Sequence, residues 1–137
     1  MNSASSKRRA VILAGGFGTR IRHILPNIPK PMAPAAGKPF VEWVIHFLAR
    51  HGIKEVILST GHMAGVISDH IARTKIAGVD IRCVAEPTAL GTAGGFVNAI
   101  RNERSPGGTW LVCNGDSLVL ANINQMYTAL EDRDVQA

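Results

Sequence analysis

Residues 10–20 read Ala10-Val11-Ile12-Leu13-Ala14-Gly15-Gly16-Phe17-Gly18-Thr19-Arg20. The first five residues are all apolar, which is typical of a parallel strand that is covered on both faces. The glycines that follow allow backbone N–H groups to approach the oxygens of a ligand closely. Arg20 ends the segment, and its planar guanidinium offers a fork of donors to phosphate groups. The segment therefore predicts a strand followed by a phosphate-binding turn.

A lysine between prolines follows in the segment Pro29-Lys30-Pro31-Met32, and its ammonium adds a compact positive charge. Two common types of glycine loop do not fit this chain. A P-loop requires a lysine directly after its last glycine, and a dinucleotide fingerprint requires a third glycine where this chain has Ile21. A tight turn without a ligand is the alternative interpretation of the loop.

Composition limits the classes of protein to which the chain can belong. Its 137 residues are 46% hydrophobic and 18% charged, which is typical of one globular domain. The net charge of +5 suits an anionic ligand, whereas scattered basic residues and few aromatic ones argue against a nucleic-acid partner. No apolar stretch is long enough for a membrane helix, so we expect no membrane association.

Cysteines and histidines show no metal-ligand spacing. Cys83 and Cys113 lie inside apolar, strand-like runs, so we expect buried free thiols and a cytoplasmic location. The histidines are interpreted as surface or structural residues.

Strand-like and helical segments alternate along the chain. We expect strands at residues 10–14, 55–60, 79–85 and 109–113, and helices at residues 39–51, 63–73, 92–101 and 122–132. This alternation predicts an α/β fold with a Rossmann-like open, mainly parallel sheet and helices on both faces. We expect residues 1–8 to form a flexible tail and residues 9–137 to form one nucleotide-binding domain.

Ligands of such folds bind at the carboxyl ends of the strands, which brings the loops 15–20, 86–95 and 114–117 together. In the last of these loops, Asp116 offers the hard carboxylate that Mg²⁺ prefers near phosphates. A turn or capping aspartate is the alternative interpretation. The long, proline-rich loop 22–38 is expected beside the same edge. A long ordered loop beside a site more often has a function than not, so we expect this loop to contribute to the site.

Glu86 ends the third expected strand, where its carboxylate can accept two parallel hydrogen bonds. Guanine offers such a pair through N1–H and N2–H₂, whereas thymine and uracil offer one donor, so guanine is weakly preferred. A capping glutamate without a ligand is the alternative. After it, Gly91 allows a close backbone approach, and Thr92 is the expected cap of the next helix.

Four motifs occur in one order along the chain: Leu13–Arg20, Pro29–Met32, Glu86–Gly94 and Asn114–Asp116. In this order they resemble the sugar-1-phosphate nucleotidylyltransferase family. The segments 28–34 and 37–40 most strongly resemble the bacterial D-glycero-α-D-manno-heptose 1-phosphate guanylyltransferases, with the mannose-1-phosphate guanylyltransferases second.

The resemblance implies that a nucleotidyl group is transferred from a nucleoside triphosphate, with GTP preferred, to a sugar 1-phosphate, with a manno-heptose 1-phosphate preferred. The products are an NDP-sugar and pyrophosphate. It implies that Arg20 holds the triphosphate, that Lys30 neutralises charge around the α-phosphate, and that Asp116 holds Mg²⁺. The residues that it implies around the nucleotide are Leu13, Ala14, Gly15, Gly16, Gly18, Thr19, Glu86, Gly91 and Thr92.

Members of that family continue well beyond the glycine-aspartate motif, and their later portion carries the sugar-binding surface and a second aspartate for the metal. We therefore expect this chain to lack the C-terminal sugar-binding portion, to leave an apolar edge or face of the sheet uncovered, and to bind nucleotide better than it turns over. The sequence leaves open whether the chain forms a homo-oligomer or is completed by another chain. The alternatives are a glucose-1-phosphate nucleotidylyltransferase and a non-catalytic nucleotide-binding fragment or subunit; a nicotinamide oxidoreductase is disfavoured.

Overall fold

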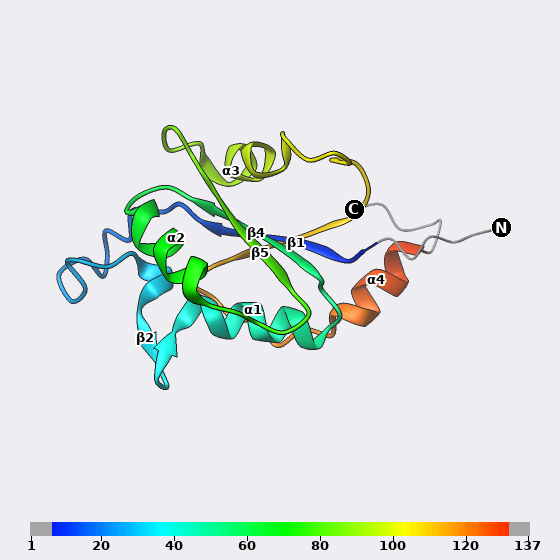
Figure 1. Cartoon of the computed structure of the whole chain (residues 1–137), viewed down its shortest axis with the longest axis horizontal. Helices are drawn as coiled ribbons and strands as arrows, with labels where there is room; N and C mark the ends of the chain where they lie inside the picture. Colours follow the sequence, from blue (N-terminus) through cyan, green and yellow to red (C-terminus); the bar gives the residue numbers. More distant parts are fainter. Residues whose placement is uncertain (1–6, 132–137) are drawn as a thin grey trace.

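The computed structural model describes residues 7–131, which form a parallel four-stranded sheet flanked by helices (Figure 1). The strands of this sheet are β1 Arg9–Ala14, β4 Glu55–Thr60, β5 Asp80–Ala85 and β6 Trp110–Asn114. The helices are α1 Phe40–Arg50, α2 Ala64–Arg73, α3 Gly91–Ile100 and α4 Ile123–Glu131. A 3-10 helix, η1 Lys30–Met32, and a small hairpin of β2 Pro34–Ala35 and β3 Lys38–Pro39 lie between β1 and α1.

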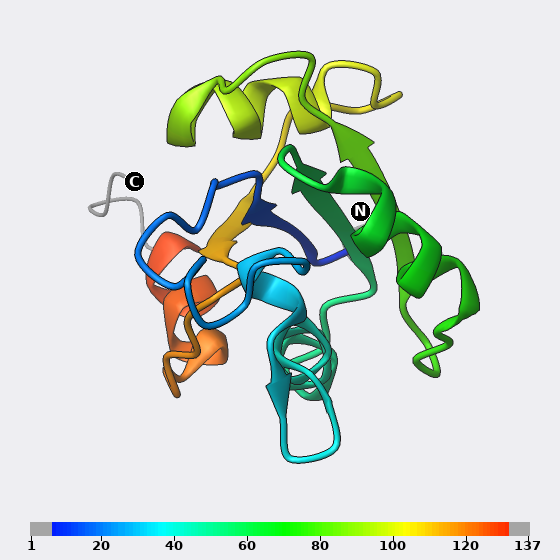
Figure 2. The same cartoon turned by 90° about the vertical axis from the view of Figure 1, so that its left-hand side faces the viewer.

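Helices cover both faces of the sheet, as predicted: α3 lies on one face, and α1 and α4 lie on the other (Figures 1 and 2). Successive side chains of a strand point to opposite faces. In β1, Ala10 and Ile12 therefore join the larger core with α1, α2 and α4, whereas Val11 packs with Ile57 and Ala99 beneath α3. The uninterrupted apolar run of β1 thus fills both halves of the core.

The strand order β5-β4-β1-β6 places β1 at the centre of the sheet. The chain runs outward from β1 through α1 to β4 and through α2 to β5, and it then returns past β1 to form β6. This reversal creates a topological switch point between β1 and β6. In open α/β sheets, ligands bind in the crevice at the carboxyl ends of the strands at such a point.

Every predicted strand and helix is present, and its ends agree with the prediction to within one residue, except that residue 132 lies outside the described residues. The prediction that Thr92 caps the third helix is wrong. Helix α3 begins at Gly91 with Leu90 as its N-cap, and no side chain caps it there. The helix starts one residue earlier than expected, at Gly91, whose φ of +70° a residue such as threonine could adopt only with strain.

Within the described residues, the proline-rich loop contains a hairpin that the sequence analysis did not predict. Its two-residue turn is formed by Ala36 and Gly37, both with positive φ. The indole N–H of Trp43, on α1, donates to the Ala35 carbonyl at 2.8 Å. The hairpin projects beyond the sheet (Figure 2), and this hydrogen bond ties the residue just before its turn to α1.

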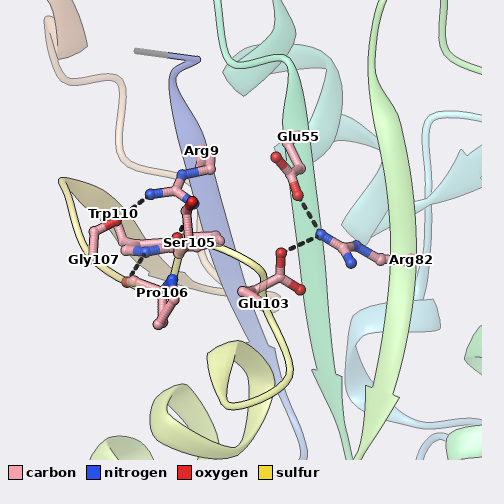
Figure 3. A network of polar contacts seen from close by, with 8 residues as sticks. All are labelled: Arg9, Glu55, Arg82, Glu103, Ser105, Pro106, Gly107 and Trp110. Carbon is pink, nitrogen blue, oxygen red and sulfur yellow. Dashed lines mark hydrogen bonds and ion pairs between the residues drawn. The ribbon is translucent and has the colours of Figure 1, made fainter.

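A polar network fastens the opposite, amino-terminal edge of the sheet (Figure 3). The guanidinium of Arg9 lies 4.0 Å from the ring centroid of Trp110, which joins β1 to β6. Arg82 pairs with Glu55 on β4 and, at 2.8 Å, with Glu103 in the segment that leads to β6. This network lies away from the carboxyl edge, so its role is to hold the strands and the α3–β6 connection.

Arg8 directly precedes β1 and is held in place. Its guanidinium donates to the His51 carbonyl at 3.0 Å and lies 4.5 Å from the ring centroid of Tyr127 on α4. The expected tail of residues 1–8 is therefore fastened at its end next to the strand. Residues 1–6 lie outside the described residues, and there the tail stays a prediction.

Strand β6 is an edge strand of the sheet, and apolar residues on it and in the segment after it are exposed to solvent. Val112 on β6 is 40% exposed, and Val119 and Leu120 in the segment after it are 73% and 79% exposed. Within the described residues, apolar side chains at and after this strand are thus open to solvent, in line with the expected uncovered edge or face. Between residues 7 and 131, no helix has the length and apolar character needed to cross a membrane.

Cys83 and Cys113 are free and partly buried, rather than fully buried as expected. Burial raises the pKa of the Cys113 thiol to about 11. At pH 8 we therefore expect a thiol reagent to modify Cys113 at least about 10-fold more slowly in the folded chain than in the denatured chain, since an unshifted thiol has a pKa of about 8.5 and a thiolate of higher pKa is the more nucleophilic. The measurement is the rate of modification of a Cys83→Ser variant with and without denaturant; equal rates would contradict the expectation.

Candidate functional site

A cavity of about 590 Å³ opens at the carboxyl edge of the sheet, where β1 and β6 end. Every residue that the sequence placed in a ligand site lines it: Leu13, Ala14, Gly15, Gly16, Gly18, Thr19, Arg20, Lys30, Glu86, Gly91, Thr92 and Asp116. The lining also includes residues that were not predicted: Phe17, Ile21, Pro31, Ala89 and Asn114. The structure brings the predicted residues together, and their binding of a ligand stays a prediction.

The glycine-rich loop turns back on itself at Gly18. This residue has φ +58°, a conformation that glycine adopts without steric cost, and its carbonyl accepts a hydrogen bond from the Ile21 N–H at 3.0 Å. The turn leaves Arg20 exposed at the cavity. Among residues 7–131, Arg20 has no ion-pair partner, so its guanidinium is available to an anionic ligand.

Gly15 is the tightest point of the site. A Cβ at Gly15 would lie 2.4 Å from Oε1 of Glu86, well inside any allowed contact. On its other side, a Cβ at Gly61 would lie 2.7 Å from the Gly15 carbonyl oxygen. The loop after β1 therefore packs directly against the ends of β4 and β5, and only glycine fits where they meet.

Lys30 and Asp116 form an ion pair across the cavity. The ammonium of Lys30 lies 2.7 Å from Oδ2 of Asp116, and both side chains are partly exposed. Partial burial raises the pKa of the Asp116 carboxyl, but the hydrogen bond and charge of Lys30, with a hydrogen bond from Ser117, outweigh this effect, so that its pKa lies below the ordinary value. Asp116 is thus held ionised, as a cation ligand must be.

Backbone geometry places both partners of this pair. The prolines on either side of Lys30 favour the short 3-10 turn, whose hydrogen bond runs from the Ala33 N–H to the Lys30 carbonyl at 3.0 Å. Gly115 crosses close over β1, and its N–H donates to the Leu13 carbonyl at 2.9 Å. The following residue, Asp116, is therefore carried over the end of β1 toward Lys30.

Glu86 is anchored by the protein itself. Oε1 accepts a hydrogen bond from the Ser59 hydroxyl at 3.0 Å, and Oε2 accepts one from the Leu90 N–H at 3.0 Å. Leu90 directly precedes α3, so its hydrogen bond ties Glu86 to the start of that helix, although no side chain caps it. Each carboxylate oxygen has a second lone pair, so a carboxylate fixed in this way can still accept from a ligand in the cavity that it lines.

Ser59 was missed by the sequence analysis, although one signal was present. It interrupts the apolar run of β4 one residue before the end of that strand and is completely buried. A buried hydroxyl needs a hydrogen-bond partner. Its partner, Glu86, lies at the end of the neighbouring strand β5.

Comparisons with known proteins agree with this geometry. A family model described as nucleotidyl transferase matches residues 9–136. The chain is 36% identical, over 118 residues, to a D-glycero-alpha-D-manno-heptose 1-phosphate guanylyltransferase of Aneurinibacillus thermoaerophilus, with 86% of this chain and 50% of that protein covered. It is 38% identical, over 117 residues, to a mannose-1-phosphate guanylyltransferase of Mycobacterium tuberculosis, with 85% of this chain and 32% of that protein covered.

A solved structure supports the same relationship. HddC from Yersinia pseudotuberculosis, complexed with GMP-PN, matches with a TM-score of 0.80 and 30% identity over 91% of this chain and 55% of its own. The chain thus spans about half the length of HddC and of the heptose relative.

Proposed function

The chain belongs to the nucleotidyl transferase family, and on this premise we propose that it binds GTP for transfer of a guanylyl group to a sugar 1-phosphate. A phosphate oxygen of the sugar phosphate attacks the α-phosphorus, a P–O bond forms, and the bond between the α-phosphorus and the bridging oxygen breaks. Pyrophosphate leaves, and the product is a GDP-sugar. The observation that carries the proposal is the cavity at the switch point, where a glycine loop, two cations and a carboxylate meet.

The cations are assigned to the phosphates by their positions. Arg20, unpaired among the described residues, suits the outer phosphates beside the glycine loop. Lys30 stands at the end of β6 next to Asp116, where a phosphate oxygen can replace the carboxylate as its partner. Because phosphoryl chemistry of this kind is accelerated mainly by positioning and charge stabilisation, these residues supply the groups it requires.

Asp116 is the residue that would hold Mg²⁺. Within the described part of the chain, no group of three or more His, Cys, Asp or Glu side chains could hold a metal ion. One ionised carboxylate at the cavity nevertheless fits Mg²⁺, which takes one or two carboxylates and completes its shell with water and phosphate oxygens. When bound, the ion would neutralise phosphate charge and act as a Lewis acid.

Glu86 is assigned to the base. Held by Ser59 and Leu90, its carboxylate keeps one orientation at the cavity, which favours a ligand with two adjacent donors such as guanine. The sugar is proposed to be a manno-heptose, after the heptose relative, with mannose as the alternative after the mannose relative. The product would serve lipopolysaccharide or other surface polysaccharide synthesis, and the site of action would be the cytoplasm.

The test is a thermal-unfolding panel with GTP, dTTP, UTP, CTP and ATP, each with and without Mg²⁺. At about a hundred times its Kd, a ligand stabilises the fold by about 2.7 kcal/mol. We expect the largest shift with GTP and Mg²⁺, and in Asp116→Asn we expect Mg²⁺ to add nothing to the shift with GTP. The control is Asp69→Asn, an exposed aspartate on α2. No shift with any nucleotide would refute the proposal.

A further inference from the structure

His62 lies behind the glycine loop, in the turn that follows β4. Its ring centroid is 5.5 Å from that of Phe17, with the ring planes tilted by 40°, which is within the range of favourable aromatic pairs. Its Nε2 lies 3.3 Å from Nη2 of Arg22. Phe17 precedes Gly18, where the loop reverses, and Arg22 follows it. The side chain of His62 therefore contacts the loop on both sides of this reversal.

The backbone of the same turn supports the loop as well. Gly61 approaches the Gly15 carbonyl so closely that a Cβ on it would lie 2.7 Å away. The next residue after His62 is Met63, which has φ +57° and therefore occupies the left-handed region that non-glycine residues rarely adopt. A small hollow behind the loop is lined by Gly18, Lys30, His62 and Met63 among others, so the turn also borders the site lysine.

The contact with Arg22 sets the role of Nε2 of His62. The guanidinium of Arg22 can only donate, so Nε2 is the acceptor in this contact. Phe17 is 54% exposed and the loop contains three glycines, so the part of the loop beyond the close packing at Gly15 gains order from its contact with His62. A glycine-rich loop that is ordered before the ligand arrives binds more tightly than one that must be ordered on binding.

We propose that His62 is a positioning residue that holds the glycine loop in its nucleotide-binding conformation through Phe17 and Arg22. This inference rests on the proposed function, since the ligand that the loop awaits is a nucleoside triphosphate. His62 itself does not line the larger cavity and touches no reacting atom. Its effect is therefore on affinity for the triphosphate, exerted through the loop.

The test is the Kd of the full chain for Mg²⁺·GTP, measured by titration calorimetry in His62→Ala and in two rescue variants. We expect His62→Ala to weaken binding by about 3–10-fold, as the loss of an aromatic pair and an exposed hydrogen bond implies. His62→Phe keeps the ring contact and His62→Gln keeps the acceptor, so each is expected to recover part of the affinity. The control is His23→Ala, an exposed histidine in the same loop region.

A double-mutant cycle between Phe17 and His62 separates positioning from general destabilisation. If the two act together, Phe17→Ala and His62→Ala are non-additive in GTP affinity, while the melting temperature without ligand changes little. Additive losses, or an unchanged Kd in His62→Ala, would overturn the inference and leave the proposed function standing. Failure of the wild-type chain to bind any nucleotide would overturn both.

Discussion

Gly15→Ala is expected to destabilise the fold by about 1–3 kcal/mol and to weaken GTP binding at least about tenfold. The added methyl group would lie 2.4 Å from Oε1 of Glu86, so either the loop or the carboxylate must move. Glu86 is tied to Ser59 and Leu90, and the loop rests against Gly61, so neither can move without losing contacts. Urea unfolding and a GTP titration measure the two effects.

The neighbouring glycine is the matched control for this substitution. A Cβ on Gly16 would meet no atom within 4 Å, and Gly16 has no positive φ. Gly16→Ala adds the same methyl group one residue along the same loop, so we expect its stability to stay within about 0.5 kcal/mol of wild type. Equal destabilisation by the two substitutions would contradict the close packing described at Gly15.

Glu86→Ala is expected to lower both stability and base selectivity. Removing the carboxylate leaves the Leu90 N–H without this acceptor, whereas the buried Ser59 hydroxyl keeps the Gly95 carbonyl at 3.1 Å, and we expect a loss of about 1–3 kcal/mol. The preference for GTP over UTP is expected to fall at least about fivefold, because the base loses a charged acceptor. The measurements are urea unfolding and competition between the two nucleotides.

Glu86→Gln separates these two effects. The amide keeps one acceptor oxygen for an internal donor, and it presents an NH₂ group where the carboxylate offered a second acceptor. We therefore expect stability to recover in part while the selectivity for GTP remains low. Glu131→Ala, at an exposed position on α4, is the control for loss of a carboxylate. Unchanged selectivity in both Glu86 variants would show that Glu86 does not read the base.

The sheet and the grouping of the site loops could be predicted because they depend on local signals. The apolar run of residues 10–14 is long enough to require cover on both faces, and the strand–helix alternation permits few topologies. Parallel strands then bring their carboxyl ends to one edge. This rule alone placed Glu86 and Asp116 beside the glycine loop, and the cavity contains both.

The contacts between side chains could not be predicted in the same way. The ion pair of Lys30 with Asp116 joins residues far apart in the sequence, and its geometry depends on Gly115 crossing β1. The hairpin between residues 34 and 39 was missed because Ala36 adopts a positive φ, which sequence rules reserve for glycine, asparagine and aspartate. His62 was interpreted as surface or structural because its partners, in the glycine loop, come from another part of the chain.

The central place of β1 has a consequence for how this chain folds during synthesis. In the order of synthesis, β1 precedes both of its neighbours, β4 on one side and β6 on the other, and its register with β6 pairs Arg9 with Trp110. At about 5–20 residues per second, several seconds pass between the emergence of these two residues. Throughout that time one edge of β1 lacks its native partner, and an unpaired edge of an apolar strand is a site where the nascent chain can pair with the wrong neighbour.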